Sequence, residues 1–401
     1  GNGVNDLESV VVTGTGGIKI SDMSNTVTAF DASGLSGDLD LVLNVDDMAN
    51  LVAAGQTITG GTGSNDSIEL NGSAIAAFTS TGIEELFFDG ASGEVIVRAT
   101  GMAGLTTLTY SGGNTNTVPN ISGLHSDGLT VNTINEGAST QTYVISAGGT
   151  LAVNVNADPA RVAAETKAAN TFNFRSPTTD AVTVNVGPYV SASATYTVQA
   201  ASSLDISIDS TSTFAGSANA SASSSVNVSG AGSLSSATIS GEKVTTLNVN
   251  VGSGDMAFGG SAIQTVSVTS GNDFTFNTGT NLSGVQTLTV NANSANLTNP
   301  SFEALDNATL IGASSMSMTT VDKASGLGNL TMDIDGFAQK ASVGTISLAS
   351  DNIVIDAAGT TGELHVGKAS GSGTFTLSGG SLGSFSAGDI DSNGVVTIDL
   401  A

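Results

Sequence analysis

A six-residue pattern of apolar and polar positions recurs along the chain. Its form is apolar-x-x-apolar-x-apolar, and its last three positions alternate as they do in a strand with one buried face. The clearest copies are IEELFF from Ile83, LTTLTY from Leu105, VTTLNV from Val244, IQTVSV from Ile263 and VQTLTV from Val285. Other copies begin at Leu7, Leu305, Leu327 and Val343, and weaker ones begin at Thr361 and Leu382. Each copy predicts a strand.

The spacing of these copies predicts how the strands are arranged. From residue 244 to residue 382, successive copies begin 16 to 22 residues apart, with Gly, Ser or Asn between them. A β-sandwich would place turns about every 8–12 residues. A period near twenty residues is instead typical of a solenoid, in which neighbouring coils stack about 4.8 Å apart and share one core. We therefore predict an all-β fold, a parallel β-solenoid (β-helix) with coils of about 20 residues.

Differences in regularity divide the chain into three predicted segments. Residues 1–110 are a β-rich solenoid segment with a glycine-rich turn at 60–68, and residues 244–401 are regular solenoid repeats. Residues 111–243 keep alternating strands at irregular spacing, which leaves β-sandwich-like segments open as an alternative. Within them, Asp158 is placed as an N-cap and Pro159 as the first helical residue of an Ala-rich stretch. This predicts a short, exposed helical insert near 158–170.

Composition excludes several classes of protein. The 401 residues carry 35 acidic side chains against nine Lys and Arg, a net charge of −26, and include no Cys or Trp. Nucleic-acid binding is excluded because no basic patch can neutralise phosphates. Disulfides and thiolate metal sites are excluded because the chain has no cysteine. The chain contains no run of 18 apolar residues, so the sequence predicts no membrane-spanning helix. The chain shows no signal peptide and begins within a strand-like pattern, so we expect a processed or partial product.

The residues needed for catalysis are sparse. The two histidines, His125 and His365, have no second histidine near them in sequence, and no G-x-S-x-G motif is present. A polysaccharide lyase or hydrolase is the enzyme class to consider for a parallel β-helix, and it would need basic and aromatic residues around its carboxylates. The chain has three arginines and four tyrosines. We expect a protein that is not an enzyme.

The turn GGTGSNDSI, residues 60–68, is the first candidate metal site. Glycines such as Gly61 and Gly63 permit bends that bring carbonyl and carboxylate oxygens to one point, as Ca²⁺ requires. The turn resembles the calcium-binding RTX nonapeptide GGxGxDxUx. One residue is inserted, so Asn65 takes the usual Asp position and Asp66 follows one place later. A plain Gly/Asn turn is the alternative, and the sequence leaves both open.

Further candidate calcium ligands lie elsewhere in the chain. The stretch DIDSNG, with Asp389, Asp391 and Asn393, matches the first half of an EF-hand loop, although Leu400 replaces the final Glu and a strand pattern follows. The pairs Asp38/Asp40 and Asp333/Asp335 each place two carboxylates on one face of a strand. Such neighbours repel each other unless a proton or a cation intervenes. Solvated surface pairs are the alternative.

These features together resemble one family. GGTGSNDSIEL followed by GIEELFFDG, with the repeated LTTLTY, VTTLNVNV and VQTLTVNA, is similar to the calcium-dependent, RTX-type S-layer proteins of Gram-negative bacteria. The motif-level similarity covers residues 58–88. The resemblance implies a type I-secreted structural protein that forms a two-dimensional lattice on the cell surface with Ca²⁺ as its cofactor. Its partners would be copies of itself and lipopolysaccharide, the latter through a region not identified in this chain. A secreted repeat adhesin that binds a host surface or glycan is the alternative.

Overall fold

The fold is all-β, as the repeat predicts. The computed structural model describes residues 7–400 except 22, 24–25, 45–54, 72–74, 77, 92–95, 99–100, 113–119, 123–127, 136–141, 147–149, 156–170, 176–180, 189, 191–193, 200–201, 221, 324–327 and 349–350. In that part of the chain there is no α-helix, and every described strand pairing is parallel. The chain divides into two compact units, residues 1–202 and 203–401.

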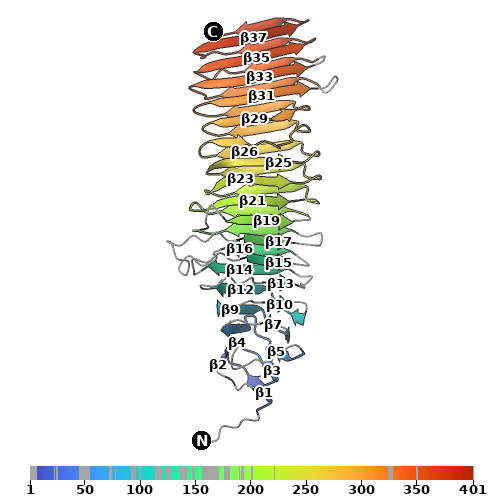
Figure 1. The fold of residues 1–401 in the computed structure, drawn as a ribbon, viewed down its shortest axis with the longest axis vertical. Coiled ribbons are helices and arrows are strands. Elements are labelled where there is room, and N and C mark those ends of the chain that lie inside the picture. Colours follow the sequence, from blue (N-terminus) through green and yellow to red (C-terminus); the bar gives the residue numbers. More distant parts are fainter. Residues whose placement is uncertain are drawn as a thin grey trace. The chain divides into compact units, whose positions relative to one another are not determined.

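The first unit is a solenoid with three sheets, here called A, B and C (Figure 1). Sheet A contains β1 (Ser9–Gly14), β3 (Ala29–Leu35), β5 (Thr57–Thr59), β8 (Thr79–Thr81) and β11 (Met102–Ala103). Sheet B contains β2 (Ile18–Ser21), β4 (Leu39–Asn44), β6 (Ser67–Asn71), β9 (Glu85–Ala91), β12 (Thr107–Gly112), β14 (Leu129–Asn135), β16 (Leu151–Val155) and β18 (Val182–Val186). Sheet C contains β7 (Ile75–Ala76), β10 (Ile96–Arg98), β13 (Asn120–Ser122), β15 (Thr142–Ser146), β17 (Thr171–Arg175) and β19 (Thr195–Gln199).

The second unit is a solenoid whose coils alternate between two sheets, here called D and E (Figure 1). Sheet D contains β20 (Leu204–Ile208), β22 (Ser225–Ser229), β24 (Thr246–Val251), β26 (Thr265–Ser270), β28 (Thr287–Asn291), β30 (Asn307–Ile311), β32 (Leu330–Asp335), β34 (Ile353–Asp356), β36 (Phe375–Ser378) and β38 (Val396–Asp399). Sheet E contains β21 (Thr213–Asn219), β23 (Ser233–Ser240), β25 (Ser253–Gly259), β27 (Phe274–Phe276), β29 (Ala295–Phe302), β31 (Met316–Lys323), β33 (Lys340–Leu348), β35 (Glu363–Gly371) and β37 (Ser384–Ser392).

Apolar side chains stack in columns inside each solenoid. In sheet D, Leu247 lies over Val266, which lies over Leu288, and all three are fully buried. The first residue of the repeat lies at the corner before the strand and is also buried, as Ile263 illustrates. The six-residue pattern therefore marks one corner residue and two inward strand residues, which explains its unequal spacing.

The same pattern occurs on both sheets of the second unit. The copies from Val244 to Leu327 lead into strands of sheet D, whereas the copy at Val343 lies within β33 of sheet E. The weaker copies at Thr361 and Leu382 lead into β35 and β37, also in sheet E. Both sheets turn one apolar face inward, so the pattern marks a strand without assigning its sheet.

The described strands of the irregular middle segment belong to the same kind of coil. Strands β14, β16 and β18 pair in parallel, as do β20 and β22. A sandwich-like arrangement therefore does not describe them. The predicted helical insert near 158–170 lies outside the described residues, and the three-part division of the chain stays a prediction. Among the described residues, none form a helix of the length and apolarity that a membrane span requires.

Polar side chains also stack from coil to coil on the outward faces. In the first unit, Asn185 donates to Asn154 and Asn154 donates to Asn132, over 2.6 and 2.7 Å. In the second unit, Asn227 donates to the Asp205 carboxylate over 2.7 Å. Each bond joins neighbouring coils through their side chains, in addition to the backbone bonds of the sheets.

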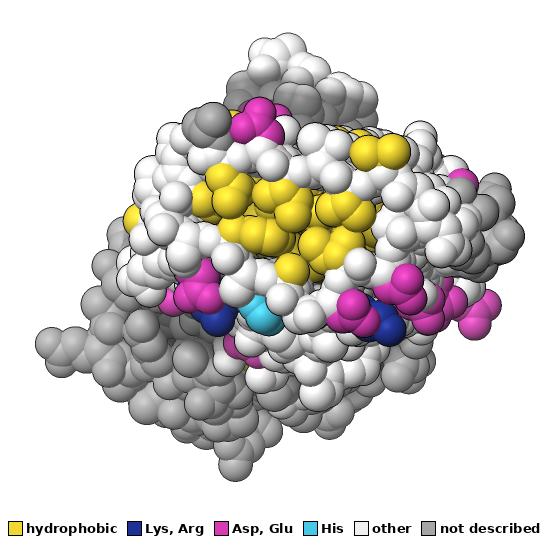
Figure 2. Space-filling view, turned by 90° about the horizontal axis from the view of Figure 1, so that it is seen from above, with side chains coloured by type: hydrophobic (Ala, Val, Ile, Leu, Met, Phe, Trp, Pro, Cys, Tyr) yellow, Lys and Arg dark blue, Asp and Glu magenta, His cyan; other side chains and the backbone are white. Residues whose placement is uncertain are grey.

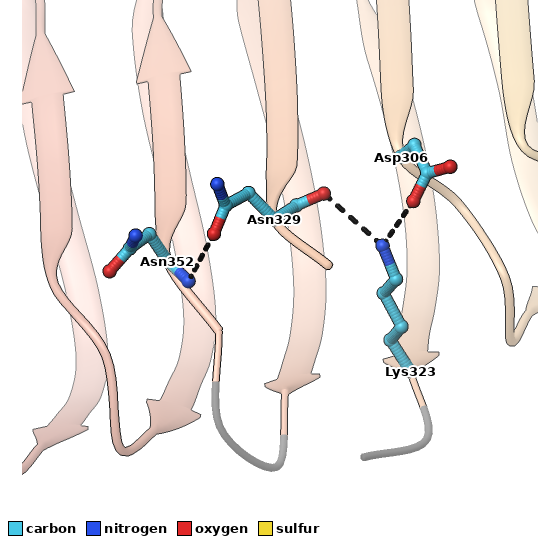
Figure 3. A network of polar contacts seen from close by, with 4 residues as sticks. All are labelled: Asp306, Lys323, Asn329 and Asn352. Atoms are coloured by element: carbon cyan, nitrogen blue, oxygen red, sulfur yellow. Dashed lines mark hydrogen bonds and ion pairs between the residues drawn. The ribbon is translucent and has the colours of Figure 1, made fainter. Parts of the chain in front are cut away.

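An ion pair between a buried lysine and a partly exposed aspartate connects corners of the second unit (Figure 3). The Lys323 side chain, at the end of β31, is fully buried, and its ammonium donates to the Asp306 carboxylate and, over 3.1 Å, to the Asn329 carbonyl. The Asn329 side chain in turn accepts a bond from the Asn352 backbone N–H. The pair thus links sheet E to successive corners that precede strands of sheet D.

The two partners of this ion pair should differ in their effect on stability. Asp306→Ala leaves a buried ammonium without its counter-charge and should lower the free energy of unfolding by about 3 kcal/mol. Lys323→Met leaves a carboxylate that is 38% exposed and can bind water, so we expect a loss below about 1 kcal/mol. Urea denaturation followed by circular dichroism measures both variants. Equal losses would contradict this account.

Candidate functional site

The glycine-rich turn forms a corner between sheets A and B of the first unit. It follows β5 and precedes β6, and the coils on both sides hold its backbone. The Gly60 N–H donates to the Thr81 carbonyl over 2.8 Å, and the Thr62 N–H donates to the Leu35 carbonyl over 2.9 Å. The turn is therefore hydrogen-bonded to the preceding and the following coil at once.

Close backbone approach explains the glycines of this corner. A Cβ on Gly60 would lie 1.8 Å from the Gly82 carbonyl oxygen, and one on Gly61 would lie 2.6 Å from the Leu35 carbonyl oxygen. A Cβ on Gly63 would meet carboxylate oxygens of Asp38 at 2.6 Å and Asp66 at 2.9 Å. A side chain at Gly60 or Gly61 would have to displace the backbone of a neighbouring coil, whereas one at Gly63 would displace carboxylate side chains.

Asp66 is the buried centre of the corner. Its side chain is fully buried, Oδ1 accepts the Leu39 N–H over 2.7 Å, and Oδ2 accepts the Gly61 N–H over 2.6 Å. Its own N–H donates to the Glu84 carboxylate over 2.9 Å. Bonds from N–H groups to a charged oxygen are among the stronger ones in proteins. Asp66 therefore fastens three successive coils together.

The predicted calcium ligands of this region separate into two groups. Asp38, Asp40 and Asn65 are exposed, and the Asn65 amide lies 3.5 Å from the Asp38 carboxylate. The Ser67 hydroxyl donates to Asp40 over 2.9 Å. The surface of the corner thus offers oxygen atoms that suit Ca²⁺, whereas both oxygens of Asp66 already accept backbone bonds. The predicted ligands of this corner are thus divided between its surface, where Asp38, Asp40 and Asn65 lie, and its buried centre, where Asp66 lies.

The Asp333/Asp335 pair has a third carboxylate beside it. Asp333 of β32 lies opposite Asp356 of β34, and all three side chains are exposed on the outward face of sheet D. Partial burial, together with the charges of Asp356 and Asp335, raises the pKa of Asp333. Asp356, which lies one coil after Asp333, is not among the ligands predicted from the sequence. The coil period is the signal that could have identified it.

The stretch with Asp389, Asp391 and Asn393 does not form an ion-wrapping loop. Asp389 and Asp391 lie in the extended strand β37, opposite Lys368 and Ser370 of β35. Asn393 follows at the corner, where its N–H donates to the Gly371 carbonyl over 3.2 Å. The match to half of an EF-hand loop therefore falls on a strand and a corner of the solenoid.

No group of three or more His, Asp or Glu side chains among the described residues is placed to hold a metal ion. His365 lies on the outward face of β35, with its Nδ1 2.8 Å from the Ser386 hydroxyl, and His125 lies outside the described residues. Any calcium site at the described carboxylates would need backbone oxygens, water or a second molecule to complete its ligands.

The comparisons with known proteins give no relative. No protein family, curated protein or solved structure matches the chain. The S-layer resemblance therefore stays a hypothesis that rests on the residues quoted for it.

Substituting Asp66 tests whether this residue stabilises the corner through hydrogen bonds or binds a metal ion. In Asp66→Asn, an amide NH₂ replaces one acceptor oxygen, and the Leu39 or Gly61 N–H loses its partner. We expect a loss of about 1–3 kcal/mol in the free energy of unfolding, equal in Ca²⁺ and in EGTA. The exposed neighbour Asn65→Ala is the control, with a change below about 0.5 kcal/mol. A loss confined to Ca²⁺ would contradict the structural role.

Asp333 should make the free energy of unfolding fall as the pH rises, which is the opposite of what a carboxylate with a lowered pKa does. Because its pKa is raised in the folded protein, the folded state binds the proton more tightly than the unfolded chain, and stability falls as the pH rises through that window. Asp333→Asn should therefore raise the free energy of unfolding at pH 7, by less than about 1 kcal/mol for so exposed a group. The gain should vanish below about pH 3, where the carboxyl group is protonated in both states.

Asp31 provides a control, because its pKa is lowered in the folded protein and its effect on stability should depend on pH with the opposite sign. The backbone N–H of Ser33 donates to its carboxylate over 2.9 Å and lowers its pKa. Asp31→Asn should therefore lower the stability at pH 7, and this difference should fade as the pH falls through the folded-state pKa. Urea denaturation from pH 3 to pH 8 measures both variants. A loss of stability in Asp333→Asn at pH 7 would count against the proposed repulsion.

Proposed function

We propose that the protein is a structural cell-surface protein that self-assembles into a calcium-stabilised two-dimensional S-layer lattice. The observation that carries the proposal is the combination of a parallel β-solenoid with regular polar outer columns. In sheet D, Thr246, Thr265 and Thr287 lie on neighbouring strands at the same outward position. Such a surface repeats with each coil, which suits many equivalent contacts between identical molecules.

Charge supports a role for calcium in this assembly. A net charge of −26 makes identical chains repel one another at low ionic strength. Exposed carboxylates such as Asp38, Asp333 and Asp356 are hard oxygen ligands, and a second molecule could complete their coordination. Bound Ca²⁺ would supply positive charge that neutralises these carboxylates and bridges two copies. In this proposal the calcium ions lie mainly between molecules.

The other parts of the proposal follow the same resemblance. The protein would be secreted, lie on the outside of the cell and have no catalytic activity. The protein would attach to lipopolysaccharide through a region that is not identified in this chain.

A secreted adhesin is the second candidate, and one groove favours it. In the second unit, the glycines of successive corners leave a shallow groove flanked by Asn250, Thr269 and Asn291. Amide and hydroxyl groups around a groove can bind the hydroxyls of a glycan. An adhesin would stay dispersed in Ca²⁺ at high concentration, whereas an array protein would form sheets.

Electron microscopy of the purified chain in millimolar Ca²⁺, and of the same sample after EGTA, tests the proposal. We expect ordered sheets in Ca²⁺ that disperse on chelation, because the carboxylates then repel again. Mg²⁺ at the same concentration is the control, because it keeps its water shell more firmly and bridges carboxylates less well. Dispersed particles in every condition would overturn the lattice and favour the adhesin.

A further inference from the structure

The shallow groove beside Asn250, Thr269 and Asn291, here called the corner groove, crosses successive coils of the second unit. It lies where the chain leaves sheet D, and these three residues are register neighbours on β24, β26 and β28. Neighbouring strands are about 4.8 Å apart, so the groove presents equivalent side chains at that repeat. A ligand that fits it should be extended and built from repeating units.

The side chains of these three residues leave their polar groups available. All three are exposed, and none of them forms a hydrogen bond with another residue of the described part of the chain. A neighbouring outward column of the same sheet differs, because Asn248 donates to Asn227 over 2.9 Å and Asn227 donates to Asp205. One polar column of sheet D thus bonds within itself, whereas the column at the groove can bond to another molecule.

Backbone forms much of the floor of the corner groove. A Cβ on Gly252 would lie 2.3 Å from the Ala231 carbonyl oxygen, and one on Gly271 would lie 3.2 Å from the Gly252 carbonyl oxygen. Side chains are therefore missing where the corners stack most closely. The groove has a volume of about 540 Å³, which is within the usual range for ligand sites, roughly 300–1,000 Å³.

A buried hydroxyl at the groove has no hydrogen-bond partner in the described structure. Ser270 lines the groove at an inward position, beside Val251 in register, and is 6% exposed. Its Oγ forms no hydrogen bond with any described residue. Buried polar groups are nearly always hydrogen-bonded, so this exception points to a bound group that completes it. A ligand hydroxyl, directly or through one water, would be such a partner.

The corner groove is neutral, which selects the class of ligand. Its lining consists only of Gly, Ala, Val, Ser, Thr and Asn. Charged side chains lie on sheet E instead, where Lys340 and Glu363 form an ion pair over 3.5 Å and Lys368 lies opposite Asp389. Figure 2 looks onto the coil of β37 and β38 and shows Lys, acidic and His side chains along one edge. An anionic ligand is further disfavoured by the net charge of −26.

We propose that the corner groove binds a linear, neutral polysaccharide that lies across the coils, with about one sugar for each coil spacing of about 4.8 Å. Successive sugars would meet Asn250, Thr269 and Asn291 in turn. Carboxamide and hydroxyl groups both donate and accept, as the hydroxyls of a sugar require. The inference deepens the adhesin candidate, on whose groove it rests, and does not depend on the lattice.

A peptide strand fits the groove less well than a glycan. Peptides that bind in extended form usually pair with an unpaired sheet edge. The backbone of these corners is already bonded to neighbouring coils, since the Gly252 N–H donates to the Gly232 carbonyl over 2.8 Å and the Gly271 N–H donates to the Val251 carbonyl over 3.0 Å. The groups left for a ligand are therefore side-chain amides and hydroxyls.

Titration calorimetry and saturation-transfer NMR in EGTA test the proposal on the full chain. The probes are extended, β-linked hexasaccharides of glucose, mannose and N-acetylglucosamine, with hexagalacturonate as the charged control and a Gly-Ser hexapeptide as the peptide control. We expect at least one neutral hexasaccharide to bind, and its disaccharide to bind about tenfold more weakly because it contacts fewer coils. Neither control should bind.

Variants locate the binding in the corner groove. Thr269→Val and Asn291→Ala each remove a polar group without filling the groove, and each should weaken binding of that hexasaccharide about three- to tenfold. Ser270→Ala should weaken it as well, while raising the Tm of the free protein because a buried hydroxyl without a partner is removed. Asn219→Ala is the matched control. It removes an exposed amide at a hollow beside the corners that follow sheet E, and it should bind like the natural sequence.

The outcomes separate this inference from the lattice. The groove assignment would be overturned if no neutral hexasaccharide bound, if the Gly-Ser hexapeptide bound equally well, or if Thr269→Val and Asn291→Ala bound unchanged. A loss in Asn219→Ala alone would move the ligand to the other hollow and would also overturn it. Calcium-dependent sheets without glycan binding would leave the array proposal in place. Glycan binding at the groove without sheets would support this inference and the adhesin, and would overturn the lattice.

Discussion

The parallel backbone hydrogen bonds between successive coils are the constraint on which the rest of the structure depends. They hold each coil in register with the next, so a side chain always lies over the equivalent side chain one coil away. Inward positions are then mostly apolar, as Leu247, Val266 and Leu288 are. Outward positions become ladders, in which Asn132, Asn154 and Asn185 bond to one another. One geometric rule therefore produces both the core and the polar surface.

The same rule explains why the glycine-rich turn resembles a metal-binding loop. Corners must stack as closely as strands, so glycine is required where the backbones of two corners come into direct contact, as Gly60 lies on Gly82. A buried carboxylate then becomes useful, because Asp66 can accept the N–H groups that a sharp corner leaves without strand partners. Glycines followed by Asp are what such a corner requires, and they are also what an RTX turn requires. The sequence motif alone does not distinguish the two.

The columns of the core could be predicted from the sequence because they depend on local alternation, which each strand displays by itself. The site residues could be predicted less well because they depend on which coils lie side by side. Asp333 and Asp335 are two residues apart and were identified together, but Asp356 joins them only through the pairing of β32 with β34. Lys323 and Asp306 meet across a corner, 17 residues apart. Unequal corner lengths prevent a fixed period from predicting such meetings.

Register also determines where the acidic surface needs an outside partner. Asp205 lies beside Asn227, whose amide donates to it, so this carboxylate is satisfied within the chain. Asp333 occupies an equivalent outward position but lies beside Asp356, and the neighbouring charge contributes to its raised pKa. A column that places a carboxylate over a carboxylate can be relieved by a proton, by a cation or by donors of another molecule. The repeat that stacks the coils therefore also produces surface positions where carboxylates of neighbouring coils lie side by side, and in the proposed lattice calcium would bind at these positions.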